Sequence, residues 1–149
     1  MKTDLVVSGY LIENDKVLLI DHKKLNLWLP PGGHIDPNET PDQALIREFK
    51  EETNLDIEIL NKDYTLPKGN TKEVSALPFH INVHSVGDHD HCCFYYICRA
   101  KNSNNIKIEK SELNDFRWFS KEELDDERIL KDIKSITLRA FKMSKILKT

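Results

Sequence analysis

Alternating apolar and polar residues divide most of this chain into short segments of the kind that form strands, separated by two segments with helical spacing. Runs rich in β-branched and aromatic residues predict strands near residues 5–12, 17–21, 57–60, 79–84, 92–100 and 116–119. The polar segments 61–72 and 101–110 carry turn-forming residues and are expected to be loops.

The first predicted helix has a clear start and a clear end. Thr40 can cap it, Pro41 suits its first position, and Gln43 can complete a capping box. Nothing breaks the helix up to Thr53, and Asn54 readily takes the left-handed conformation in which helices end. We therefore expect a helix over residues 41–53.

A second helix is expected near the end of the chain, opened by Asp125 and Asp126. Its apolar residues recur at helical spacing: Ile129, Leu130, Ile133, Ile136, Ala140, Phe141 and Leu147. Strands in hairpin-like pairs, interrupted by two helices, predict an α+β fold in which helices pack on a mixed sheet.

Composition narrows the class of protein. The chain of 149 residues, with 39% hydrophobic and 32% charged residues, is typical of a single soluble domain, here residues 1–149. Asp4, Glu13 and Asp15 interrupt the first apolar runs, so we expect neither a signal peptide nor a membrane span, and a cytoplasmic protein. A net charge of −3 argues against broad nucleic-acid binding.

Three cysteines, Cys92, Cys93 and Cys98, fall on one predicted strand. Adjacent residues of a strand point to opposite faces, so these side chains cannot be bridged normally. We expect reduced, mostly buried thiols.

The helix over residues 41–53 carries an unusual group of carboxylates. Glu48, Glu51 and Glu52 span about 100° of its surface, and like charges at positions i and i+4 destabilise a bare helix. A cation would reverse that effect, and converging carboxylates suit Mg²⁺ or Mn²⁺, which usually bridge to substrate phosphates. The alternative is a solvated acidic face.

The residues around this group extend the pattern. Gly32 and Gly33 follow two prolines and let the backbone approach a ligand or the helix closely. From Gly33, five residues lead to Glu39, and seven more lead to Arg47-Glu48-Phe49-Lys50-Glu51-Glu52. This spacing resembles the signature of the Nudix hydrolases. Phe49 stands where that family usually has an aliphatic residue and Asn54 replaces its final glycine, and neither change removes a ligand.

The resemblance implies an α/β/α sandwich around a mixed sheet and hydrolysis of nucleoside diphosphates linked to another group, with Mg²⁺ or Mn²⁺ as cofactor. It implies Glu48 and Glu52 as metal ligands, while Glu51 shares a second ion or orients water. Arg47 is expected to hold Glu39 and the glycine loop rather than to touch substrate. Further similarity is found in Trp28-Leu29-Pro30-Pro31 and in residues 116–124.

In this family the general base often comes from a loop outside the signature, which makes Glu112 a candidate. Asp115 is its rival, and either residue can instead be a solvated loop acid. The predicted catalytic residues are therefore Arg47, Glu51, Glu52 and Glu112.

Four histidines, His80, His84, His89 and His91, lie within twelve residues. His89 and His91 resemble the HxHxD pattern of some Nudix subgroups, although Cys93 stands where the acid would be. They can contact phosphate or base, hold an accessory metal, or be exposed polar residues, and the spacing does not indicate a structural zinc site. The predicted substrate-binding set is Gly32, Gly33, His89, His91 and Trp28, although Trp28 is more simply a packing residue.

We therefore expect a hydrolase for a small phosphorylated substrate, either a monomer or a homodimer. The alternatives are a non-catalytic nucleotide sensor and an isomerase of the isopentenyl diphosphate type, which would use a cysteine such as Cys92 or Cys93. The sequence does not name the substrate, because fold and motif do not determine it.

Overall fold

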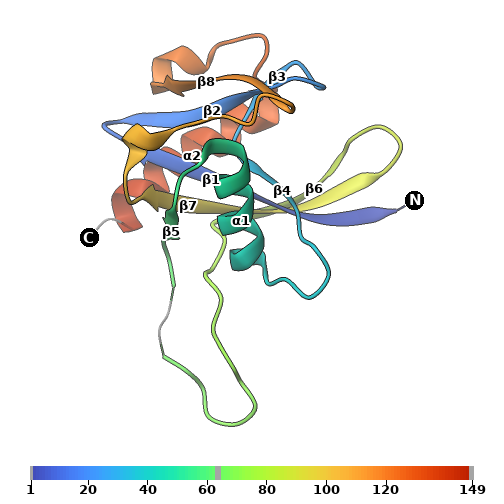
Figure 1. Ribbon diagram of the computed structural model, residues 1–149, viewed down its shortest axis with the longest axis vertical. Coiled ribbons are helices and arrows are strands. Elements are labelled where there is room, and N and C mark those ends of the chain that lie inside the picture. The colour runs from blue at the N-terminus through green and yellow to red at the C-terminus, as the bar shows by residue number, and fades with distance from the viewer. Residues whose placement is uncertain (1, 63–64, 148–149) are drawn as a thin grey trace.

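The computed structural model describes residues 2–62 and 65–147, so residues 63 and 64 of the predicted 61–72 loop lie outside the described part. Figure 1 shows a twisted sheet with a helix on each side. The elements are β1 (Thr3–Glu13), β2 (Lys16–His22), β3 (Leu27–Leu29), β4 (Gly32–His34), α1 (Pro41–Thr53), β5 (Ile57–Ile59), β6 (His80–Ser85), β7 (Asp90–Ala100), β8 (Leu113–Phe119) and α2 (Lys131–Leu147), with short 3₁₀ turns at Ser103–Asn105 and Lys121–Leu124.

The sheet is mixed, and β1 and β7 form its centre. They run parallel, from the pair Thr3 and Asp90 to the pair Leu11 and Cys98. β4 pairs antiparallel with β1, while β5 and β6 pair antiparallel with β7. The end of β1 turns into β2, which lies between β3 and β8. The long shared pairing of β1 and β7 fixes which side chains meet at either end of the sheet.

Alternation along β1 divides the core into two layers. Val7 and Leu11 pack with α1, whereas Val6 and Tyr10 pack with α2 on the opposite face. In Figure 1, α1 lies in front of the sheet and α2 behind it. The predicted α+β fold, a mixed sheet between helices, is confirmed.

The local signals for α1 act as the sequence indicates. Thr40 Oγ1 accepts a hydrogen bond from Gln43 N, and Thr40 N donates to Gln43 Oε1, which closes the capping box. Asn54 ends the helix in the left-handed conformation, with φ of 65°. Phe49 is fully buried, and a Cβ at Gly9 would lie 2.6 Å from its ring, so Gly9 makes room for the larger side chain.

The second helix begins later than predicted. It starts at Lys131, because Asp126 serves a separate turn: its Oδ1 accepts from Arg128 N and its carbonyl accepts from Ile129 N. The short strands β3 and β4 were also not predicted. Among the described residues, no helix is long and apolar enough to cross a membrane.

Candidate active site

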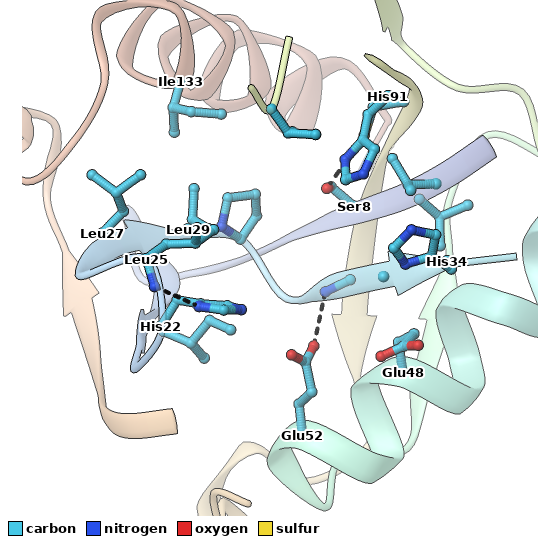
Figure 2. A pocket seen from close by; sticks show the side chains of 18 of the residues that line it. Ser8, His22, Leu25, Leu27, Leu29, His34, Glu48, Glu52, His91 and Ile133 are labelled. Atoms are coloured by element: carbon cyan, nitrogen blue, oxygen red, sulfur yellow. Dashed lines mark hydrogen bonds between the residues drawn. The ribbon is translucent and has the colours of Figure 1, made fainter. Parts of the chain in front are cut away.

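Glu48 and Glu52 project from α1 toward β4, as Figure 2 shows. Gly32 N donates to Glu52 Oε1 at 2.9 Å. A Cβ at Gly33 would lie 2.5 Å from the carboxyl carbon of Glu48, and one at Gly32 would lie 2.0 Å from Val7 O. Both positions therefore require glycine. At Gly33 a side chain would collide with the Glu48 carboxylate, and at Gly32 it would collide with the backbone of β1.

The two carboxyl groups lie in a poorly solvated place. Glu52 is only 5% exposed, and its burial raises its pKa to about 8. Burial also raises the pKa of Glu48, against the opposing effect of the Arg47 guanidinium. The negative charges of Glu48, Glu51 and Glu112 raise the pKa of Glu52 further, although the Gly32 hydrogen bond lowers it. Two poorly solvated carboxylates one helical turn apart repel each other until a cation binds between them.

A divalent ion fits this donor set. Carboxylate oxygens are the ligands that Mg²⁺ and Mn²⁺ prefer, and the pair offers them from a rigid helix beside two glycines. Glu52 Oε1 is held by Gly32 N, which leaves its second oxygen unconstrained by that bond. We therefore place the candidate metal ligands at Glu48 and Glu52.

Arg47 ties this region together. Its Nε and Nη2 donate to both oxygens of Glu39, at 2.6 and 2.9 Å. Nη2 also donates to His34 O at 3.0 Å, and Nη1 donates to Glu48 Oε1 at 2.9 Å. The guanidinium thus links α1 to the segment after the glycines, as the sequence predicts for a positioning residue.

A cavity of about 750 Å³ opens beside the carboxylates. Its walls include Gly32, Gly33, Glu48, Glu52 and Glu112, and it extends to the turn after β2 and to the start of α2. A volume of this size is typical of a small-molecule site.

The cavity separates the two candidate bases. Glu112 lies just before β8 and on the wall, where its charge acts on both Glu48 and Glu52. Asp115 lies three residues further along, borders a separate shallow hollow, and accepts from Phe116 N. Only Glu112 of the two therefore shares the cavity with the helix carboxylates, among the described residues.

Glu51 has a different environment from its neighbours. Its side chain is 59% exposed, and Arg47 Nη1 donates to it at 3.3 Å. It borders the shallow hollow on the outer side of α1. A role for Glu51 in a second ion or in orienting water would require an ion bound toward this outer edge.

Trp28 lies in the core. It is 7% exposed, its ring packs edge-on against Phe119 at 5.1 Å, and Arg128 lies over its face at 5.2 Å. The described residues that line the cavity do not include it. We therefore assign Trp28 to packing and do not include it in the proposed substrate site.

Three basic residues on the cavity wall were missed by sequence reasoning. His22 ends β2, Lys23 and Lys24 follow it, and all three line the cavity. Consecutive basic residues in a turn between two apolar runs were the available signal. The two lysine ammonium groups are suited to substrate phosphates, whereas burial lowers the pKa of His22 and disfavours its charged form.

The structure brings a second set of polar residues together. Oxygen or nitrogen atoms of Asp4, His34, His89 and His91 all lie within 4.8 Å of one another. His34 and His91 line the cavity, on the side of β4 away from Glu48 and Glu52 in Figure 2. His89 adjoins His91, with 3.2 Å between their Nε2 atoms. Asp4 and His34 were not predicted to join the histidine pair.

The three cysteines are free, and Cys93 and Cys98 are buried, as predicted. Cys93 borders the cavity, but its burial raises the pKa of the thiol to about 11. A thiol in that environment is a poor nucleophile at neutral pH.

Comparison with known proteins gives one consistent family. The sequence model described as NUDIX domain matches residues 2–140. A NUDIX-family hydrolase from Clostridium perfringens has a solved structure that is 29% identical, with a TM-score of 0.79 over 97% of this chain and 99% of the other.

Two curated relatives match over shorter stretches. The 8-oxo-dGTP diphosphatase of Proteus vulgaris is 53% identical over 57 residues, which cover 35% of this chain and 51% of that protein. The RNA pyrophosphohydrolase of Marinomonas sp. (strain MWYL1) is 39% identical over 70 residues, which cover 40% of this chain and 44% of that protein. The chain thus spans about half the length of these relatives.

Proposed function

The chain belongs to the Nudix family, and we propose that it is a metal-dependent pyrophosphohydrolase. Its substrate would be a nucleoside triphosphate or a compound linked through a nucleoside diphosphate, and the reaction would cleave a phosphoanhydride bond. The proposal treats residues 1–149 as a single domain that acts in the cytoplasm.

One observation supports the proposal most strongly. A buried carboxylate, Glu52, and a half-buried one, Glu48, lie against Gly32 and Gly33 at the wall of a cavity large enough for a nucleotide. A buried carboxylate with its pKa raised to about 8 is unfavourable for stability once it is charged. Such a cost is retained at sites that bind ions or carry out chemistry.

The metal ion, when bound, would neutralise phosphate charge and lower the pKa of a water. Glu48 and Glu52 would hold it, and the Gly32 hydrogen bond would fix the orientation of the Glu52 carboxylate. Arg47 would keep Glu48 and the glycine segment at a constant distance from each other. Glu51 would contribute from the outer edge of the helix.

Glu112 would act as the general base. It faces the same cavity as the metal ligands, so it can take a proton from a water placed between them and the substrate phosphate. Proton transfer to a carboxylate in this position leaves hydroxide character on the attacking oxygen. Asp115 would have no part in the reaction because it borders a different hollow.

The substrate would lie between the glycine segment and the basic turn after β2. Lys23 and Lys24 would neutralise phosphate oxygens that extend beyond the metal. A nucleotide is supported by the relatives, which are named for 8-oxo-dGTP and RNA pyrophosphate hydrolysis.

Two other functions fit less well. A nucleotide sensor of the same fold would not need the Glu48 and Glu52 pair together with Glu112 on one cavity wall. An isomerase would need a reactive cysteine, and the raised pKa of Cys93 disfavours that role.

A substrate panel tests the proposal. The chain is incubated with nucleoside triphosphates including 8-oxo-dGTP, nucleotide sugars, ADP-ribose, dinucleoside polyphosphates and 5′-triphosphorylated RNA, first with Mg²⁺ and then with Mn²⁺. Formation of phosphate, pyrophosphate, nucleotides and sugar phosphates is followed by chromatography for wild type and for Glu52→Gln. We expect turnover of at least one compound that needs the metal and falls about 100-fold or more in the variant. Binding without turnover across the panel would favour the sensor.

A further inference from the structure

We propose that Asp4, His34, His89 and His91 form a second metal site, selective for Zn²⁺ or a similar transition metal, on the face of β4 opposite Glu48 and Glu52. The proposal does not depend on the hydrolase activity.

The four residues share one face of the sheet because of strand pairing. Asp4 on β1 lies beside His91 on β7, and His34 on β4 lies beside Val6, two residues from Asp4. Residues paired across strands and residues two apart point to the same side. His89 precedes β7 by one residue and lies two positions before His91. Three segments far apart in sequence thus direct four side chains to one point.

The distances fit a tetrahedral ion. Asp4 Oδ2 lies 3.2 Å from His34 Nε2 and 3.4 Å from His89 Nε2, and His89 Nε2 lies 3.2 Å from His91 Nε2. A tetrahedron with zinc–nitrogen distances of 2.0–2.1 Å has edges of about 3.3 Å. A set of three imidazole nitrogens and one carboxylate oxygen suits Zn²⁺ better than Mg²⁺.

The atoms around the cluster prepare it for metal binding. Asp88 Oδ1 lies 2.7 Å from His89 Nδ1, so the proton of this ring is held there and Nε2 is left to bind. Lys2 Nζ lies 3.3 Å from Asp4 Oδ1, which leaves Oδ2 for the histidines. Two ring nitrogens at 3.2 Å, as in His89 and His91, need a proton or a cation between them.

This site is separate from the one proposed for Mg²⁺ or Mn²⁺. Gly33 pairs with Val7 and faces α1, whereas His34 faces the other side of the sheet. Four protein ligands would fill the coordination shell, so the ion would be structural rather than catalytic. It would link β1, β4 and the turn before β7, and it would thereby stabilise Gly32 and Gly33 from the face of the sheet opposite α1.

The test measures zinc directly. The chain is stripped of metal and dialysed against a small excess of Zn²⁺, with excess Mg²⁺ present to occupy Glu48 and Glu52, and zinc per chain is measured by mass spectrometry. Wild type and Glu52→Gln should retain about one zinc each. Asp4→Asn, His89→Ala and His91→Ala should lose zinc affinity by about 100-fold or more, since even second-shell losses cost 10–100-fold. His84→Ala is the matched control, because its ring lies near His91 but outside the group of four.

Co²⁺ gives a readout that needs no variant. Bound at these four residues, it should show the intense visible absorption of tetrahedral cobalt, whereas an oxygen-ligated octahedral ion at Glu48 and Glu52 absorbs weakly. Absence of zinc in wild type, equal retention by all variants, loss of zinc in Glu52→Gln, or an octahedral cobalt spectrum would each overturn the proposal.

Discussion

Glu52→Gln tests how much the charge of the Glu52 carboxylate lowers the stability of the fold when no metal is bound. Gln keeps the size of the side chain and an oxygen that can accept from Gly32 N, but it has no charge. In the metal-free wild type, Glu52 titrates at about 8 in the folded state against 4.5 as its ordinary value. This difference corresponds to about 5 kcal/mol against the charged form.

The sign of the effect follows from proton binding. A carboxyl whose folded pKa exceeds its unfolded pKa stabilises the fold least at high pH, because its charged form is less favourable in the folded state than in the unfolded state. The contribution of Glu52 to stability should therefore be greatest below about pH 4.5 and should be lost as the pH rises from there to about 8. Between about pH 5.5 and 8.5 the loss due to this group is about 3 kcal/mol.

Urea denaturation in EDTA measures this loss for wild type and Glu52→Gln at both pH values. The variant should gain about 3 kcal/mol relative to wild type as the pH rises, since other groups titrate equally in both proteins. Mg²⁺ at the higher pH should restore stability to wild type alone. A difference between the two proteins that changes by less than about 0.5 kcal/mol would refute the reasoning.

Three further substitutions test the roles of individual residues. Glu112→Gln should lower turnover by about 100-fold or more with unchanged metal affinity, whereas Asp115→Asn should retain wild-type turnover. The opposite result would show that Glu112 is not the general base. Arg47→Lys should cost about 1–3 kcal/mol in thermal or urea unfolding and also lower turnover, because the bidentate pairing is lost, while Arg117→Lys at an exposed pair should cost less than about 1 kcal/mol. Gly33→Ala should weaken Mn²⁺ binding by about 10-fold or more in a calorimetric titration, since the added methyl group displaces a metal ligand; unchanged affinity would contradict the close approach.

The features that sequence reasoning predicted well depend on residues near each other in the chain. The capping box of Thr40 and Gln43 and the left-handed Asn54 are local, so α1 has the predicted bounds. Helical periodicity also grouped the carboxylates on one arc. It did not show that Glu48 and Glu52 face the cavity while Glu51 lies outside it, because that depends on where the sheet packs.

The features that were missed depend on long-range pairing. Asp4 and His34 meet His89 and His91 only because β1 pairs with both β4 and β7. The spacing in the sequence identified His89 and His91 as a pair, but it could not show that Asp4 and His34 join them. The late start of α2 has a local cause that propensity did not resolve, since Asp126 can serve a turn as readily as a helix cap.

The most direct test of the central claim is Mn²⁺ binding followed by electron paramagnetic resonance. Metal-free wild type, Glu52→Gln and His89→Ala are titrated at about pH 8, where the ion readily displaces the proton of a carboxyl group into solvent. The account predicts that Glu52→Gln loses Mn²⁺ affinity by about 10-fold or more, while His89→Ala binds Mn²⁺ as wild type does. Equal Mn²⁺ affinity in wild type and Glu52→Gln would contradict the assignment of the site to the carboxylates of α1.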